Sequence, residues 1–184
     1  MIYLLRHGQT DWNATRKLQG ITDIPLNDNG RQMAIEAGEK YKDIDFTLCF
    51  CSPLVRAKET AELFLQGKNV PIIEDERFKE MHFGEYEGMD FLELEKNQTI
   101  YELFNEPEKY VAQNGTESFE ELFARTSSAI KDIKKLYDIE NNHILIVGHG
   151  AMCSGIICSC EGIQLSDFWT TLLKNCELYE LKNA

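Results

Sequence analysis

Two apolar segments of the chain end in the same way, with a histidine followed by a glycine. Residues 4–8 read Leu-Leu-Arg-His-Gly, and residues 146–150 read Ile-Val-Gly-His-Gly. Short apolar runs of this kind are typical of buried strands, and glycine at their ends lets the backbone turn or approach a ligand closely. If the two strands are neighbours in a parallel sheet, His7 and His149 meet at its carboxyl edge, where such sheets bind ligands.

The remaining chain alternates apolar runs with segments of helical periodicity. We expect strands at residues 1–5, 45–51, 70–73 and 143–147, with an edge strand at 176–181. We expect helices at 30–42, after 52–53, at 119–137 and at 150–160, with caps at Asp28 or Asn29 and at Ser52, and with Pro53 in a first turn. This alternation predicts an α/β fold, a three-layer sandwich whose mostly parallel central sheet is flanked by helices.

The length of 184 residues favours one domain spanning 1–184. Residues 78–115 interrupt the alternation. They are irregular, acidic and aromatic, with short helices expected near 90–96 and 101–110, and we expect them to form a lid-like insertion. The aromatic side chains expected to cover a leaving group are Phe83, Tyr86, Phe91, Tyr101, Phe104 and Tyr110.

The charge balance narrows the set of partners. The formal net charge is −12, from 19 Lys and Arg against 31 Asp and Glu, which argues against nucleic acid or an anionic membrane as a partner. A small anion can still bind where a few cations gather. The chain has no apolar run approaching the ~20 residues of a membrane span, and its start does not read as a signal peptide, so we expect a cytoplasmic protein.

Six cysteines occur, at positions 49, 51, 153, 158, 160 and 176. Their spacing differs from that of zinc knuckles, and their apolar surroundings predict buried, reduced thiols. One alternative function is that of a zinc hydrolase whose metal ion is bound by His7 and His149. Arg6 and Arg56 would repel a dication there, so we expect no metal and no other cofactor.

Two arginines lie close to the expected crevice. Arg6 precedes His7 at the end of the first strand, and Arg56 follows the second strand in the first turns of a helix. The planar fork of a guanidinium matches the oxygens of a phosphate group, and the N-terminus of a helix adds positive potential. The pattern therefore indicates a phosphate site.

These residues belong to longer matches with a known family. Residues 6–13, Arg-His-Gly-Gln-Thr-Asp-Trp-Asn, resemble the signature of the histidine phosphatase superfamily, also called phosphoglycerate mutase-like. Later segments resemble further parts of that family in the same order: 18–20, 23–26 with Gly30, 52–57 with 60–61, Glu80 with 83–88, Gly115 with 117–118, and 148–150. Several segments matching in order are a far more specific signal than a lone Arg-His-Gly.

The resemblance implies a role for each site residue. His7 would attack phosphorus and become a phosphohistidine, with its ring held by a backbone carbonyl near Gly8. Arg6, Arg56 and His149 would surround the phosphate oxygens, and the loop residues Gly8, Thr10 and Asn13 would add to substrate binding. Glu80 would protonate the leaving oxygen and then deprotonate water. We expect the carboxylates nearby in sequence, Asp75, Glu76, Glu85 and Glu87, to help keep Glu80 protonated.

The family contains more than one activity. The compact turn at 83–88 resembles the phosphatase branch, although Tyr86 stands where that branch often has Trp. The resemblance therefore implies a metal-independent phosphomonoester hydrolase of the histidine acid phosphatase type, acting on a small phosphorylated metabolite such as a sugar phosphate or α-ribazole phosphate. A cofactor-dependent phosphoglycerate mutase and a catalytically idle phospho-ligand binding module remain alternatives, and a homodimer is left open.

Overall fold

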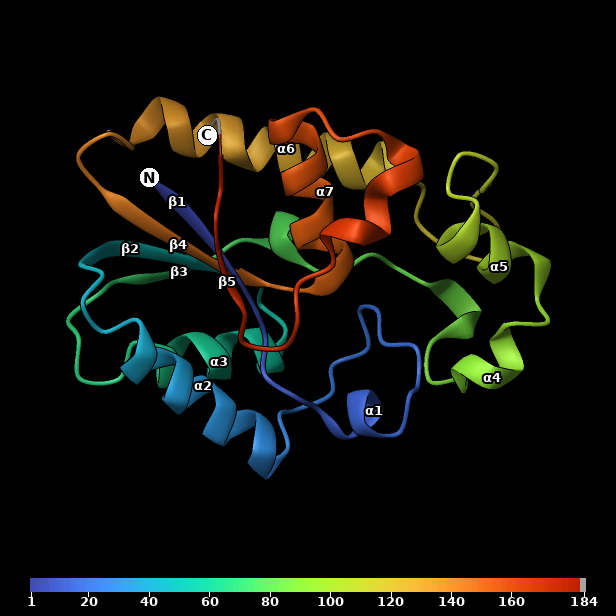
Figure 1. Ribbon diagram of the computed structural model, residues 1–184, viewed down its shortest axis with the longest axis horizontal. Helices are drawn as coiled ribbons and strands as arrows, with labels where there is room; N and C mark the ends of the chain where they lie inside the picture. The colour runs from blue at the N-terminus through green and yellow to red at the C-terminus, as the bar shows by residue number, and fades with distance from the viewer. Residues whose placement is uncertain (183–184) are drawn as a thin grey trace.

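A single sheet organises the computed structural model, which describes residues 1–182 (Figure 1). The strands of this part of the chain stand in the order β3-β2-β4-β1-β5, and all neighbouring pairs are parallel except β1 with β5. Their bounds are Ile2–Arg6 for β1, Phe46–Cys51 for β2, Ile72–Glu74 for β3, His143–Gly148 for β4 and Leu178–Glu180 for β5. Each expected strand is present, and the last lies at an edge as predicted.

Helices connect the parallel strands. They are α1 (Asp11–Ala14), α2 (Asp28–Lys40), α3 (Val55–Phe64), α4 (Phe91–Leu94), α5 (Gln98–Asn105), α6 (Phe119–Leu136) and α7 (Gly150–Glu161). Three 3₁₀ turns, η1 (Glu76–Phe78), η2 (Gly84–Tyr86) and η3 (Leu165–Thr171), complete the elements of the described residues. The segment between β1 and α2 contains the short helix α1.

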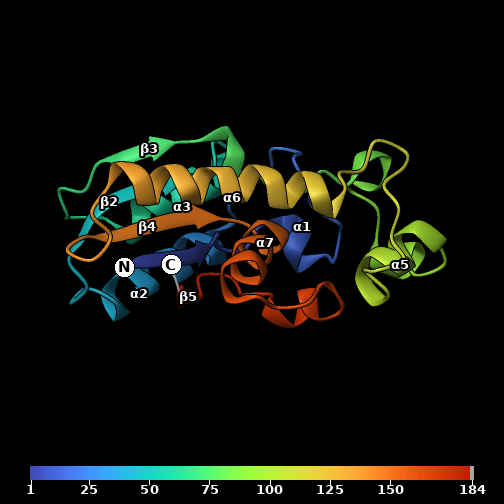
Figure 2. The ribbon, with the colours of Figure 1, turned by 90° about the horizontal axis from the view of Figure 1, so that it is seen from above.

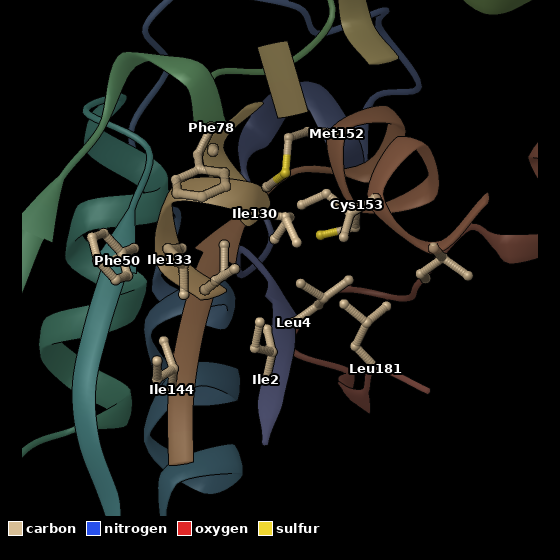
Figure 3. Packing of buried hydrophobic residues seen from close by; sticks show 14 of the residues in the cluster. Ile2, Leu4, Phe50, Phe78, Ile130, Ile133, Ile144, Met152, Cys153 and Leu181 are labelled. Atoms are coloured by element: carbon tan, nitrogen blue, oxygen red, sulfur yellow. The ribbon is translucent and has the colours of Figure 1, made fainter. Parts of the chain in front are cut away.

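Alternating side chains of the central strands fill two separate cores. On one face, Ile2 and Leu4 pack with Ile144 and with side chains of α6 and α7 (Figure 3). On the other face, Tyr3 and Leu5 pack with side chains of α2 and α3. Successive strand residues point to opposite faces, so the all-apolar strands are explained by helices on both sides. The sheet lies between α6 and α7 on one side and α2 and α3 on the other (Figure 1), and α6 crosses over the strands when they are seen from above (Figure 2). This arrangement confirms the predicted three-layer α/β sandwich.

A third apolar cluster lies outside the sheet. Phe83, Leu94 and Leu103, from the segment predicted as a lid-like insertion, pack with Phe119 of α6 and Phe168 of η3. The helices α4 and α5 stand at one end of the molecule, away from the strands (Figure 1). The two short helices expected in this segment are therefore present, slightly shorter than predicted.

Two helix caps differ from the sequence prediction. The cap of α2 is Asn27, whose side chain accepts a hydrogen bond from the Gly30 amide, rather than Asp28 or Asn29. Helix α3 begins at Val55, with Leu54 as an N-cap that makes no side-chain bond. Ser52 is not its cap, because its hydroxyl contacts His149 instead.

All six cysteines are free, and five of them are buried, as the sequence predicts. The exception, Cys160, is half-buried. Within residues 1–182 no helix has the length and apolar character needed to cross a bilayer.

Candidate active site

The register of the central strands brings the two histidines together. Strands β1 and β4 are parallel and pair Arg6 with Gly148, so His7 and His149 each lie one residue beyond a paired position. The His7 amide continues the ladder by donating to the Gly148 carbonyl at 2.9 Å. The imidazole rings lie 5.2 Å apart between centroids, and both side chains are buried.

The ring of His7 is held in one tautomer. Its Nδ1 lies 2.6 Å from the Gly8 carbonyl oxygen, which can only accept, so Nδ1 carries the proton and Nε2 keeps its lone pair. Burial, reinforced by the charges of Arg56 and Arg6, holds the pKa of His7 well below its ordinary value. The ring is therefore neutral at pH 7, and the lone pair of Nε2 is free.

His149 is oriented from strand β2. Ser52 directly follows that strand, and its Oγ lies 2.8 Å from Nε2 of His149. The Ser52 hydroxyl also accepts the Leu54 amide, so its own proton is available to Nε2 and the proton of His149 then lies on Nδ1. Nδ1 is buried and has no partner among the described residues. Burial, followed by the charge of Arg56, also holds the pKa of His149 well below its usual range.

Two guanidinium groups flank the histidines. Arg56 is fully buried in the first turn of α3, and it donates to the carbonyls of Thr22 at 2.9 Å and Gly20 at 2.6 Å. Arg6 donates to the Leu173 carbonyl at 2.7 Å. The Nε atoms of both arginines are buried and lack a partner within residues 1–182. Burial lowers the pKa of Arg56 to about 10, so the group remains charged at neutral pH.

Glu80 faces the same site from the segment between η1 and η2. Its Oε1 accepts the amides of Met81 at 2.9 Å and Met152 at 3.0 Å, and its Oε2 accepts the amide of Ala151 at 3.2 Å. Oε2 and the Arg6 guanidinium carbon both lie 3.6 Å from where a Cβ would stand on Gly150. The carboxyl group is thus beside Arg6, at the N-terminus of α7.

The pKa of Glu80 is raised, but for a reason other than the one the sequence suggests. Burial raises it, while the amides of Met81 and Met152 and the charges of Arg56 and Arg6 act in the opposite direction. The neighbouring acidic residues are not the cause. Glu87 is occupied elsewhere, because its carboxylate accepts the Ile21, Thr22 and Phe83 amides.

The loop after β1 places its residues at different depths. Asn13 lines the cavity, and its Oδ1 accepts the Thr10 amide. Thr10 is fully buried, caps α1 and donates to the side-chain oxygen of Gln19. The Gly8 amide donates to the Thr60 hydroxyl, and a Cβ on Gly8 would lie 2.4 Å from the Gly30 carbonyl oxygen. Gly8 and Thr10 therefore shape the loop, whereas Asn13 reaches the cavity wall.

A cavity of about 100 Å³ opens beside Arg6, Asn13 and Glu80, and its lining does not include His7, His149 or Arg56. Its polar lining consists of Arg6, Asn13, Lys17, Gln19 and Glu80. Its apolar lining includes Leu18, Phe83, Phe91, Phe104, Trp169 and Leu172. Three of the aromatics expected over a leaving group thus line the cavity, while Tyr86, Tyr101 and Tyr110 do not. Trp169 of η3 is also part of the cavity wall.

Several residues that hold the site were missed by sequence reasoning. Asn175 donates to the His7 carbonyl, Arg125 donates to the Glu80 carbonyl, and Glu87 binds the loop that carries the Arg56 acceptors. Such bonds to main-chain atoms have no spacing signature, so only the fold reveals them. Within the described residues, no group of three or more His, Cys, Asp or Glu side chains is arranged to hold a metal ion.

The fold and the site together define a protein of the phosphoglycerate mutase-like class, with a pair of buried histidines at the carboxyl edge of a doubly covered sheet. Residues 2–183 match the histidine phosphatase superfamily, branch 1, and the chain belongs to this family. The resemblance seen in the sequence is thereby confirmed.

Relatives of this chain include a protein named as a phosphatase and proteins named as phosphoglycerate mutases. It is 36% identical to "Uncharacterized phosphatase PhoE" of Bacillus subtilis, over 98% of this chain and 90% of that protein. It is 31% identical to "Probable phosphoglycerate mutase GpmB" of Escherichia coli, over 96% and 82%. Among solved structures, phosphoserine phosphatase of Entamoeba histolytica, in complex with 3-phosphoglyceric acid, superposes with a TM-score of 0.82 and 32% identity, over 96% and 87%.

Proposed function

We propose that the protein hydrolyses the phosphate monoester of a small metabolite through a phosphohistidine at His7, without a metal ion. The observation that carries the proposal is the neutral ring of His7, whose Nδ1–H is bonded to the Gly8 carbonyl beside two buried guanidinium groups. A neutral imidazole with a fixed tautomer is the form that can attack phosphorus.

The first step forms a bond between Nε2 of His7 and phosphorus and breaks the bond to the leaving oxygen. Arg6 and Arg56 neutralise charge on the equatorial oxygens, Nδ1–H of His149 donates a hydrogen bond to one of them, and Asn13 adds a donor from the loop. Glu80, whose pKa is raised by burial, acts in its protonated form and gives its proton to the leaving oxygen. In the second step Glu80 takes a proton from water, the water oxygen bonds to phosphorus, and the P–N bond breaks.

The test compares wild type with His7→Ala on p-nitrophenyl phosphate, with and without EDTA. Turnover by wild type that survives EDTA and is lost in the variant supports the proposal. A phosphorylated protein that is stable to base and labile to acid, seen in wild type only, identifies the intermediate. Turnover retained by His7→Ala would overturn the proposal, and loss of wild-type turnover in EDTA would overturn its metal-independent part.

A phosphoglycerate mutase is the second candidate, favoured by the 31% identity to the Escherichia coli protein of that name. The two candidates differ in the acceptor of the phosphoryl group, which is water for a phosphatase and a phosphoglycerate hydroxyl for a mutase. Incubation with 3-phosphoglycerate, with and without a bisphosphoglycerate primer, separates them. Release of orthophosphate supports the phosphatase, and conversion to the 2-isomer supports the mutase. The substrate, the cellular location and the assembly state, including the homodimer, stay predictions.

A further inference from the structure

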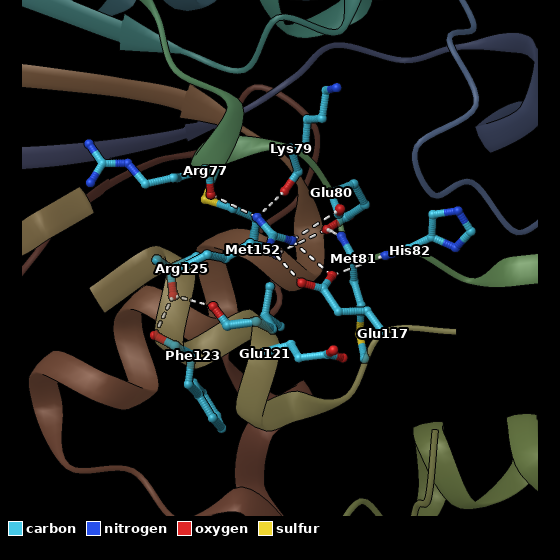
Figure 4. Close-up of polar contacts among 12 residues, drawn as sticks. Arg77, Lys79, Glu80, Met81, His82, Glu117, Glu121, Phe123, Arg125 and Met152 are labelled. Atoms are coloured by element: carbon cyan, nitrogen blue, oxygen red, sulfur yellow. Dashed lines mark hydrogen bonds and ion pairs between the residues drawn. The ribbon is translucent and has the colours of Figure 1, made fainter. Parts of the chain in front are cut away.

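A guanidinium group binds the backbone on which Glu80 is mounted. Arg125 lies on α6, and its Nη1 donates to the carbonyls of Arg77 and Lys79, each at 2.7 Å. Its Nη2 donates to the carbonyl of Glu80 at 3.1 Å (Figure 4). One side chain therefore satisfies three main-chain acceptors within four residues of the chain.

A carboxylate holds this guanidinium and continues the same contact. Glu117 accepts Nε of Arg125 at 2.6 Å and Nη2 at 3.0 Å, and both side chains are largely buried. The same carboxylate accepts the amide of His82 at 3.1 Å. The main chain is thus fixed at Glu80 by Arg125 and at His82 by Glu117.

This support matters because Glu80 lies on neither a helix nor a strand. The segment between η1 and η2 has no ladder or helical bonds to fix its backbone, apart from an isolated bridge at Phe83. The carboxyl oxygens of Glu80 are bound by amides of α7, so the carboxyl group and its main chain are held by different elements. A shift of the backbone would change how far the carboxyl group reaches into the cavity.

We infer that Arg125, oriented by Glu117, is a positioning residue that sets the reach of the Glu80 carboxyl group toward the leaving oxygen. The inference rests on the proposed role of Glu80 as general acid. A misplacement of about 1 Å in such a group costs on the order of 10²-fold in rate. Arg125 does not itself line the cavity, and it contacts the lining through the main chain of Glu80. Its charge is also one of several that lower the pKa of His149, and Arg125→Lys keeps that charge.

The experiment compares two leaving groups. An alkyl phosphate needs a proton on its leaving oxygen, whereas 2,4-dinitrophenyl phosphate releases a stable phenolate without one. The value of kcat/KM reports the steps up to phosphohistidine formation. We expect Arg125→Lys to lower kcat/KM for the alkyl ester about 10- to 100-fold, with a change of less than about threefold for the dinitrophenyl ester.

The matched control is Arg77→Met. Arg77 also joins η1 to α6, through Asp132 and Ser128, but its side chain binds no main-chain atom of residues 79–82. We expect Arg77→Met to change kcat/KM by the same factor for the alkyl ester and for the dinitrophenyl ester. Glu117→Gln is the second variant should Arg125→Lys not fold, because it keeps the shape of the carboxylate while weakening its hold on Arg125. It should show the same selective loss.

A double variant separates positioning from general structural support. In a Glu80→Gln background, Arg125→Lys should cause no further loss on the alkyl ester, since the group it positions is already gone. An additive loss there, or an equal loss on both esters in the single variant, would overturn the inference. If Glu80→Gln itself shows no dependence on the leaving group, the proposed acid role has failed, which is a different result from failure of Arg125 to position it.

Discussion

At the residue scale, burial shifts the pKa values of three side chains of the site toward their uncharged forms. Burial and the adjacent guanidinium groups hold the pKa values of His7 and His149 well below the ordinary value, and burial raises the pKa of Glu80. The same cations thus leave His7 nucleophilic and remain available to phosphate oxygens.

The raised pKa of Glu80 gives a pH prediction. A general acid must be protonated, so kcat/KM for an alkyl phosphate should fall as the pH rises through the raised pKa of Glu80. We expect Glu80→Gln to lower kcat/KM about 10²-fold and to remove that alkaline limb. The substrate ionises in the same way in both assays, so the difference between the two pH profiles does not contain its ionisation. Superimposable pH profiles would remove Glu80 from the mechanism.

The contact between Ser52 and His149 gives a second prediction. In Ser52→Ala, Nε2 of His149 loses its only described partner and the tautomer is no longer fixed. We expect kcat/KM to fall about tenfold, the equivalent of one hydrogen bond of about 1.4 kcal/mol. Ser154→Ala is the control, because it removes a buried hydroxyl that has no partner in the described chain. Equal kinetics in the two variants would contradict the assignment.

At the element scale, hydrogen bonds to Glu87, which follows η2, hold the loop before α2 in place. Glu87 binds the amides of Ile21 and Thr22, and the carbonyls of Gly20 and Thr22 in turn hold the Arg56 guanidinium. The Thr22 hydroxyl also contacts the Glu87 carboxylate. The acidic segment therefore supports the phosphate site through a backbone relay.

This relay predicts an effect on phosphate binding. Glu87→Gln places a side-chain amide donor against the backbone amides of Ile21 and Thr22, which are donors too. The loop should therefore shift, and its carbonyls should no longer hold Arg56 in a fixed position. We expect the inhibition constant of orthophosphate to rise about tenfold, about 1.4 kcal/mol. Glu85→Gln, two residues away and exposed, removes the same charge without the contact. Matching inhibition constants in the two variants would show that the relay does not reach Arg56.

The elements themselves were largely predictable from the sequence, and their caps were not. Apolar runs located every strand, most clearly the central strands β1 and β4, because a strand covered on both faces is apolar along most of its length. The cap of α2 moved from Asp28 or Asn29 to Asn27, since several polar residues precede the helix and only backbone geometry selects one.

The candidate site could be predicted where it follows strand ends, and not where it depends on main-chain contacts. His7, His149, Arg6 and Arg56 follow from strand ends, and the resemblance supplied Glu80. Ser52 was predicted as a helix cap, and Arg125 was not singled out. Both act through atoms whose positions depend on the whole fold.

At the scale of the whole molecule, the two neutral histidines make stability depend on pH. Their folded pKa values lie well below that of an unfolded histidine, about 6.5, so only the unfolded chain takes up these protons near pH 6. Stability should therefore fall as the pH drops below about 6.5. Each histidine contributes a slope approaching about 1.4 kcal/mol per pH unit.

Urea unfolding of wild type and His7→Gln between pH 5 and pH 7 measures this slope. We expect the variant to lose less stability per pH unit by about 1.4 kcal/mol, the contribution of one histidine. Parallel curves would mean that folding does not lower the pKa of His7, which would contradict the assignment of its buried ring as neutral throughout this pH range.

The pairing of Arg6 with Gly148 joins two strands that are far apart in the sequence, at the centre of the sheet. The chain must close a loop of most of its length before the imidazole pair exists, and such distant pairings form slowly and at high entropic cost. During refolding, catalytic competence should consequently be among the last properties to return. A partly assembled chain would acquire helices and apolar clusters while still being unable to transfer a phosphoryl group.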